Sequence, residues 1–166
     1  MRDLVFRRVT PHDAPALAAC FERNDVPELT RHFSPFPLTA EQAYVLARSD
    51  RLDAYFGAFG SDGVVVGFSM LRGRDEGYEV PSLGIFVDRA EQGAGIGAWL
   101  LDETLAAADS AGAPAVRLSV YADNQGAQRL YRSRGFAESE RATVRRADGS
   151  ERVRIVMVRR RRPPTG

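Results

Sequence analysis

The chain has 166 residues, of which 44% are hydrophobic and 27% charged, a composition typical of a globular domain with a core of ordinary size. A net charge of +1 and the lack of a membrane-length apolar run argue against a nucleic-acid-binding or membrane-spanning chain. Cys20 is the only cysteine, so an internal disulfide is excluded and the cytoplasm is the expected compartment.

The first third of the chain predicts one strand followed by two helices. Residues 4–9 alternate between apolar and polar side chains, as in a half-buried strand. Thr10 then provides an N-cap for the first helix, with a proline directly behind it. Residues 24–37 contain three prolines and are expected to be irregular. A second helix is expected from the Thr39 cap to about Asp50.

The middle of the chain predicts three strands and a long helix. Residues 55–59 and 64–71 form an antiparallel pair around a glycine-containing turn. A short apolar run at residues 83–87 predicts a buried strand. A helical pattern then extends from residue 95 to about residue 111.

The last third predicts a strand at residues 116–120 and a helix at residues 124–132. Two further strands pair across a hairpin turn at Asp148-Gly149. Strands and helices in this order predict an α/β fold in which helices cover the faces of a mixed sheet.

Basic residues are unevenly distributed. All 23 are arginine, and four of them form a run at residues 159–162. Four charges without interleaved aromatic residues favour a solvated tail over a nucleic-acid site. We therefore expect one domain over residues 1–160 and an Arg- and Pro-rich tail over residues 161–166.

A glycine-rich turn joins the central strand to the long helix. Residues 92–98 have the sequence QGAGIGA and begin five positions after Val87. Such a turn collects backbone N–H groups at a helix N-terminus, where they and the helix dipole favour a phosphate. A P-loop is excluded because the chain contains no lysine, and a dinucleotide fingerprint is excluded because the third glycine, Gly97, falls one position early.

A second motif, N-x-x-A-x-x-L-Y-x-x-x-G-F, extends from Asn124 to Phe136. Asn124 can cap the helix and Gly135 can adopt a positive φ behind it, so an ordinary amphipathic helix would explain these positions one by one. The order and separation of the two motifs, Q-x-x-G-x-G and this one, resemble those of the GNAT superfamily of N-acetyltransferases. The predicted order of strands and helices is also similar to that of the GNAT fold.

The resemblance implies a mixed sheet of about seven strands flanked by about four helices. It also implies acetyl-CoA as the cofactor and direct acetyl transfer to an amine, with no metal. Two parallel strands would splay apart and admit the cofactor. The residues implied to hold acetyl-CoA are Phe86 and Val87 for the pantetheine arm, Gln92, Gly93, Ala94, Gly95, Ile96, Gly97 and Ala98 for the pyrophosphate, and Asn124.

The same resemblance implies two catalytic residues. Tyr131 would donate to the departing thiolate, since its ordinary pKa of about 10 keeps it protonated at neutral pH. Many relatives carry a glutamate base at the position that Pro81 occupies here, so Glu79 is the candidate base and Ser82 a candidate water-holder. An exposed glutamate without a catalytic role is an equal alternative for Glu79.

The acceptor is expected to be the primary amine of a small molecule, such as an amino sugar. The Pro- and Phe-rich residues 26–38 would form a lid over a compact pocket, with residues 32–36, Arg72, Glu76 and Tyr78 on the acceptor side. For His32 a helix-end cap or a surface position is favoured.

Two alternatives stay open beside this function: acetylation of a protein or peptide, and a non-catalytic module that binds acyl-CoA. Neither nucleic acid nor membrane is an expected partner. The resemblance leaves open a homodimer through the C-terminal strands.

Overall fold

The computed structural model of the chain describes residues 3–48 and 52–162. Seven strands form one sheet in the order β1-β2-β3-β4-β5-β7-β6. The strands are β1 (Leu4–Arg8), β2 (Ala54–Gly60), β3 (Val65–Arg72), β4 (Ser82–Val87), β5 (Ala115–Tyr121), β6 (Ala137–Arg145) and β7 (Glu151–Arg160). The helices are α1 (Ala14–Asn24), α2 (Pro27–Thr30), α3 (Ala40–Ala47), α4 (Ile96–Ser110) and α5 (Gln125–Ser133), with 3-10 turns η1 (Pro11–Asp13), η2 (Arg74–Glu76) and η3 (Arg89–Glu91).

The predicted α/β class and the order of the elements are confirmed, with one correction in the region expected to be irregular. Helix α2 forms there because Val26 is extended, Pro27 takes the first helical position and Glu28 lies in the first turn. Thr39 caps α3 as expected, its hydroxyl accepting from the backbone N–H of Gln42 at 3.1 Å. Helix α3 ends at Ala47, whereas its predicted end near Asp50 lies outside the described residues.

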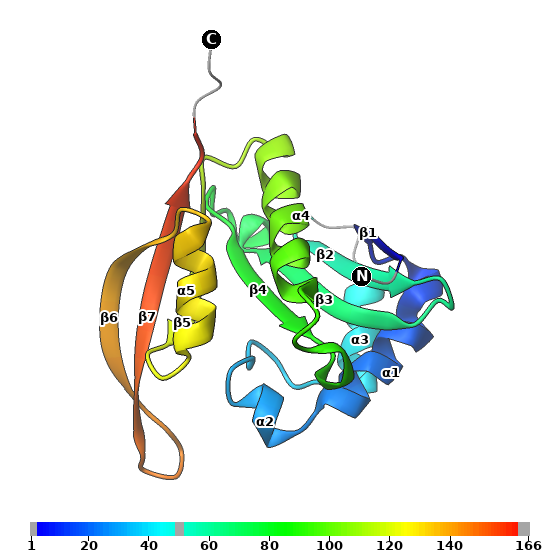
Figure 1. Cartoon of the computed structure of the whole chain (residues 1–166), viewed down its shortest axis with the longest axis horizontal. Coiled ribbons are helices and arrows are strands. Elements are labelled where there is room, and N and C mark those ends of the chain that lie inside the picture. Colours follow the sequence, from blue (N-terminus) through cyan, green and yellow to red (C-terminus); the bar gives the residue numbers. More distant parts are fainter. Residues whose placement is uncertain (1–2, 49–51, 163–166) are drawn as a thin grey trace.

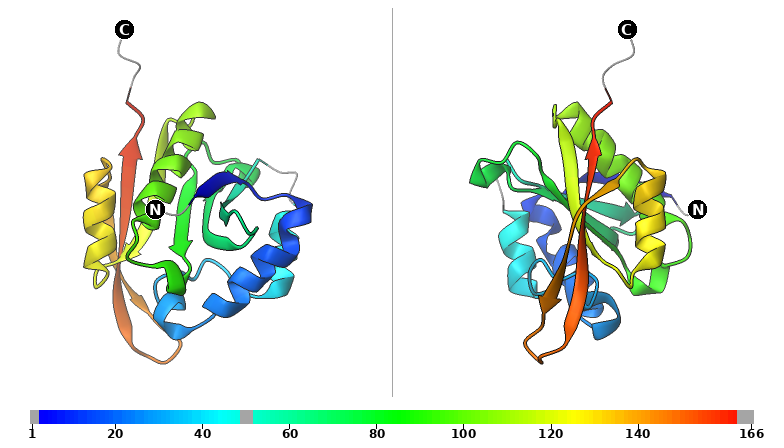
Figure 2. Two further views of the ribbon diagram at one scale, coloured as in Figure 1. Left: turned by 45° about the vertical axis from the view of Figure 1, so that its right-hand side comes forward. Right: turned by 90° about the vertical axis from the view of Figure 1, so that its left-hand side faces the viewer.

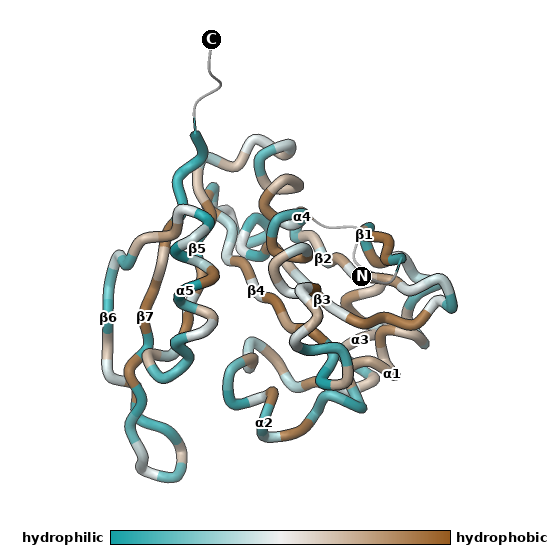
Figure 3. Tube along the Cα trace, in the orientation of Figure 1, coloured by the Kyte–Doolittle hydropathy of each residue, from teal (hydrophilic) through white to brown (hydrophobic). Residues whose placement is uncertain are grey.

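Helices cover both faces of the sheet. Figure 2 shows α1 and α3 on one face and α4 and α5 on the other. The core under α1 and α3 is aromatic: Phe21 packs on Phe68 with ring centroids 5.2 Å apart, and Phe33 packs on Phe86 at 4.9 Å. In Figure 3 the apolar residues concentrate in the central strands, whereas β6 and its hairpin are hydrophilic. Within the described part of the chain, no helix is long and apolar enough to cross a membrane.

The sheet is antiparallel except where β4 meets β5. These two strands share one parallel register pair, Ser82 with Arg117, supported by a hydrogen bond from Arg117 N–H to the carbonyl of Pro81 at 3.0 Å. Beyond it β4 continues along β3 and β5 continues along β7. The two strands therefore diverge toward their carboxyl ends, as Figure 1 shows, and the expected splay is present.

The start of α1 depends on a buried carboxylate. Asp13 forms a capping box with Thr10 and receives two hydrogen bonds from the Arg7 guanidinium, at 2.6 and 2.9 Å. The bonds from Arg7 are the main reason that the pKa of Asp13 falls to about 2. A carboxylate with a lowered pKa stabilises the fold above its unfolded pKa, and that stabilisation is lost as the pH falls through the folded value.

Asp13→Asn should therefore lower the free energy of unfolding by roughly 1 to 2 kcal/mol at neutral pH, measured by urea denaturation. The difference from wild type should shrink as the pH falls from about 4 toward about 2. Asp25→Asn, at the exposed C-cap of α1, is the control, with an expected change below about 0.5 kcal/mol. A pH-independent effect of Asp13→Asn would rule out this origin of the stabilisation.

Candidate functional site

A cavity of about 290 Å³ lies where β4 and β5 diverge. Its walls come from six parts of the chain: the segment after α2, the strands β3, β4, β5 and β7, and helix α5. Ligand pockets in proteins hold roughly 300 to 1,000 Å³, so the cavity suits a small group. The lining residues are His32, Phe33, Ser34, Pro35, Met70, Ser82, Leu83, Gly84, Ile85, Ser119, Val120, Tyr121, Tyr131 and Arg154.

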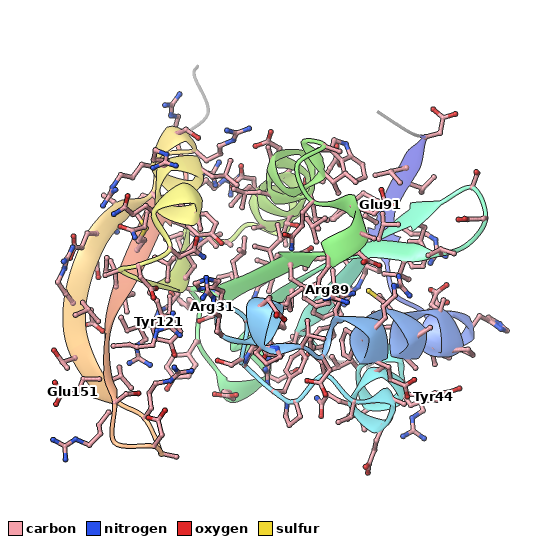
Figure 4. The ribbon with its side chains drawn as sticks, turned by 60° about the horizontal axis from the view of Figure 1, so that its bottom comes forward. Arg31, Tyr44, Arg89, Glu91, Tyr121 and Glu151 are labelled. Carbon is pink, nitrogen blue, oxygen red and sulfur yellow. The ribbon has the colours of Figure 1, made fainter. Side chains whose placement is uncertain are left out.

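The segment after α2 covers one side of the cavity and is anchored near its start by two contacts. On one side the buried ring of Phe33 anchors it in the aromatic core. On the other side Arg152 of β7 donates to the carbonyl of Arg31 at 2.6 Å and stacks over the Tyr121 ring at 3.6 Å. Asp123 fixes the same guanidinium at 2.9 Å. Figure 4 shows Arg31 and Tyr121 on the two sides of this junction. The expected lid is thus tied to the C-terminal half of the sheet.

The glycine-rich turn leads into α4 as the sequence predicts. Gly93 and Gly95 have φ values of 85° and 82°, in the left-handed region that favours glycine. Gly95 is the N-cap of α4, and its carbonyl accepts the first helical bond, from Trp99 N–H at 3.2 Å. The N–H groups of residues 96–98 consequently have no intrahelical partner. Because residues 92–95 are exposed, an anion can reach this helix end.

Helix α1 fixes the beginning of this turn. The Arg23 guanidinium pairs with the buried carboxylate of Asp88, and the other oxygen of Asp88 accepts from Ala90 N–H at 3.0 Å. The side-chain oxygen of Asn24 accepts from Arg89 N–H at 3.0 Å. These contacts fix the chain between β4 and α4 before the glycines begin. The turn is therefore held in place without a ligand.

The remaining residues predicted to bind the cofactor are either buried in the core or hydrogen-bonded to the backbone next to them. The side chains of Phe86 and Ile96 are buried in the core, so only their backbone groups can meet a ligand. Gln92 donates from its side-chain amide to the carbonyl of Val87 at 3.2 Å and closes the turn. The side-chain oxygen of Asn124 caps α5 by accepting from Ala127 N–H at 3.3 Å.

Tyr131 reaches the cavity from α5. Its ring packs edge-on against Phe136 with centroids 5.8 Å apart, which fixes its orientation. Burial raises the pKa of Tyr131 to about 12, so the phenol keeps its proton at neutral pH. Tyr131 is therefore a hydrogen-bond donor and not a base.

His32 also lines the cavity, in place of the cap or surface position expected from the sequence. Its Nε2 accepts from the Nε–H of Arg31 at 3.1 Å. Burial, followed by the charge of Arg31, lowers the pKa of His32, so the neutral ring is favoured. Since Nε2 is an acceptor, the proton lies on Nδ1, which is buried and has no hydrogen-bond partner within residues 3–48 and 52–162.

The cavity includes only part of the predicted acceptor side. Ser82 lines it, whereas Glu79 is exposed and lies outside the lining, as do Arg72 and Tyr78. Arg154 was not predicted: it is exposed, as a charged residue on a strand usually is, and it also lines the cavity. Apolar and polar residues alternate around Val120 in β5. This alternation was a signal that Ser119 and Tyr121 share one face of the strand, opposite to Val120.

Comparisons with known proteins agree with this architecture. A family model described as the acetyltransferase (GNAT) family matches residues 19–136, more than half of the chain. A comparison with curated protein sequences returned no significant match.

Solved structures are similar over almost the full length. A GNAT-family acetyltransferase from Streptococcus pneumoniae has a TM-score of 0.77 and 23% identity, over 95% of this chain and 99% of that one. A ribosomal-protein-alanine N-acetyltransferase from Brucella melitensis has a TM-score of 0.78 and 23% identity, with coverages of 95% and 99%. An acetyltransferase structure from Salmonella typhimurium, solved with its cofactor acetyl-CoA, has a TM-score of 0.80 and 18% identity, with coverages of 99% and 97%. Because the sequence identities are this low, the structural similarity establishes the fold alone.

The glycine turn can be tested with two matched substitutions. Gly95→Asp should weaken acetyl-CoA binding more than about 100-fold, because it adds bulk and negative charge at the proposed pyrophosphate site. Gly112→Asp is the control, since Gly112 has a φ of 80° at the opposite end of α4 and should suffer similar strain. Calorimetric titration measures both affinities. Equal affinities in the two variants would refute the assignment of this turn.

Proposed function

The chain belongs to the GNAT family of acetyltransferases, and we propose that it transfers the acetyl group of acetyl-CoA to the primary amine of a small molecule. The observation that carries the choice of acceptor is the small cavity of about 290 Å³ between β4 and β5, which the segment after α2 covers on one side. Phe33 and Arg152 hold its cover in place, so an extended peptide has little room beside the cofactor.

The proposed cofactor site extends from the cavity to the start of α4. The backbone of Phe86 and Val87 pairs with the pantetheine arm as an added strand would. The N–H groups of residues 92–98 bind the pyrophosphate, and each charge-assisted bond contributes about 1.5 to 3 kcal/mol. Several such bonds offset the cost of ordering a long flexible cofactor.

The proposed chemistry is a direct transfer. The lone pair of the neutral amine attacks the thioester carbonyl carbon, the carbon–sulfur bond breaks, and the nitrogen gives up one proton, which the departing thiolate takes up. Tyr131 donates a hydrogen bond to the sulfur as its charge develops. Its raised pKa, about 12, does not prevent this role, because the donor keeps its proton until the thiolate forms.

The amine must lose its proton before attack. For an amine like that of lysine this costs about 4.6 kcal/mol at neutral pH, so a base or a water relay accelerates the reaction. We assign the base to Glu79, acting through a water held by Ser82. Ser82 lines the cavity, and exposed Glu79 precedes it by three residues, with buried Pro81 between them.

Acetylation of a protein N-terminus is the second candidate. Structures of similar fold carry that activity in their names, among them the ribosomal-protein-S18-alanine N-acetyltransferase from Escherichia coli. An α-amine has an ordinary pKa near 8 and would need less help from a base. The cover over the cavity is the feature that favours the small acceptor.

We further propose that the protein is cytoplasmic and that it forms a homodimer. Cys20 is buried, and burial raises the pKa of its thiol to about 12, so it is a poor nucleophile for disulfide exchange. Strand β6 forms one edge of the sheet and could pair with a second copy, although its exposed face is hydrophilic.

Thiol release from acetyl-CoA across small amines, amino sugars and peptides tests the proposal. Tyr131→Phe should lower kcat by about 100-fold and leave the KM for acetyl-CoA nearly unchanged, because only the donor to the leaving sulfur is lost. Tyr44→Phe, on the exposed face of α3, is the control. Turnover of peptides alone would favour the second candidate, and acetyl-CoA binding without any turnover would contradict catalysis.

The base assignment makes a separate prediction. Glu79→Gln and Ser82→Ala should both lower kcat/KM by about tenfold in mildly acidic solution and little above the pKa of the amine, where the free amine is already abundant. Glu76→Gln, an exposed acid in the same connection, should leave the pH profile unchanged. An unaltered profile in Glu79→Gln would remove Glu79 as the base.

A further inference from the structure

We infer that the acceptor carries an anionic group near its amine, such as a carboxylate or phosphonate, and that Arg154 and His32 bind this group. The inference rests on the proposed function and specifies its substrate class. It follows from the charges and the unused hydrogen-bond donors of the cavity.

The cavity lining contains a positive charge and no negative one. Among the described residues that line it, Arg154 is the one charged side chain, and neither aspartate nor glutamate is present. Glu79 is exposed and outside the lining. The carboxylate of Asp123, on the turn after β5, is already paired with Arg152 at 2.9 Å. A cationic acceptor would therefore meet an uncompensated positive charge.

Arg154 lines the cavity, unlike the other arginines of the C-terminal hairpin. Most of them have carboxylate partners, as in the pairs Arg141–Glu138, Arg145–Glu151, Arg152–Asp123 and Arg159–Asp109. Within residues 3–48 and 52–162, the Arg154 guanidinium has neither a hydrogen bond nor an ion pair, and its exposed side chain lines the cavity. Its five N–H donors are thus available to a ligand.

The register of the sheet places Arg154 beside the reaction site. Arg154 pairs with Tyr121 across β5 and β7, so their side chains lie on one face of the sheet. Ser119, two residues earlier on β5, shares that face and lines the cavity. The Tyr121 ring is already covered by Arg152 at 3.6 Å, which leaves Arg154 turned to the cavity and not to this ring.

His32, in the segment after α2, adds a second unused donor to the cavity lining. Its Nε2 accepts from Arg31, so the neutral ring carries its proton on Nδ1, and this buried nitrogen has no partner among the described residues. A buried donor without an acceptor is unfavourable, and a small turn of the ring would let an anionic ligand satisfy it. An ammonium group could not, because it offers only donors.

The inference predicts a preference that depends on charge. The probes are short α-amino acids, the matching aminophosphonates, and the uncharged amides of the same amino acids. Wild type should favour the anionic compounds over the amides by at least about tenfold in kcat/KM, the effect of one charge-assisted hydrogen bond. The aminophosphonates separate a site for anions in general from one shaped for a planar carboxylate.

Arg154→Gln should raise the KM for the anionic compounds by about 10- to 100-fold and leave kinetics with the amides unchanged. Arg154→Lys should recover part of the loss. Arg145→Gln, an exposed residue of β6 outside the cavity, is the control. Thermal melting of each variant separates loss of binding from loss of fold.

Equal use of acids and amides by wild type would overturn the inference and leave small-amine acetylation standing. An equal loss on acids and amides in Arg154→Gln would also overturn it, since that pattern places the guanidinium at the thioester. Turnover of peptides without any small amine would overturn both the inference and the proposed function.

Discussion

The site depends on the short stretch over which β4 and β5 pair. One parallel register pair, Ser82 with Arg117, holds the two halves of the sheet together before the strands diverge. Each strand keeps its antiparallel neighbour, so the divergence does not break the sheet. Backbone hydrogen-bonding groups that would otherwise join β4 to β5 face a cavity of about 290 Å³ instead. A ligand that enters as an extended chain can satisfy them, which is why we propose this opening as the pantetheine site.

Two sets of contacts fix the segments on either side of this opening. Helix α1 fixes the glycine turn through the Arg23–Asp88 ion pair, so the donors at the start of α4 are arranged before a ligand arrives. On the acceptor side Arg152 joins the segment after α2 to β7. The donor and acceptor sides are thus held by different parts of the chain, both attached to a rigid sheet. This arrangement lets the acceptor side vary while the cofactor side stays the same.

The sequence predicted the geometry of the glycine turn and of the α5 cap well, because both are local. A helix N-terminus, left-handed glycines and the Asn124 cap each depend on neighbouring residues, and each lies where the sequence predicts. The lining of the cavity depends on contacts between distant segments, and the sequence predicted it poorly. His32 lies in the cavity because α2 and Arg152 place it there, and Arg154 lies there because β7 pairs with β5. No local pattern indicates either position, whereas Glu79, close to the motif in sequence, is outside the cavity lining.

A crystal structure of the protein with coenzyme A bound would test the proposed cofactor site most directly. We expect the pantetheine arm to lie between β4 and β5 and the pyrophosphate to bind the N–H groups of residues 92–98. The sulfur should lie within hydrogen-bonding distance of the Tyr131 hydroxyl, about 3.5 Å or less. A cofactor bound outside the opening between these strands, or a sulfur remote from Tyr131, would contradict the proposed site.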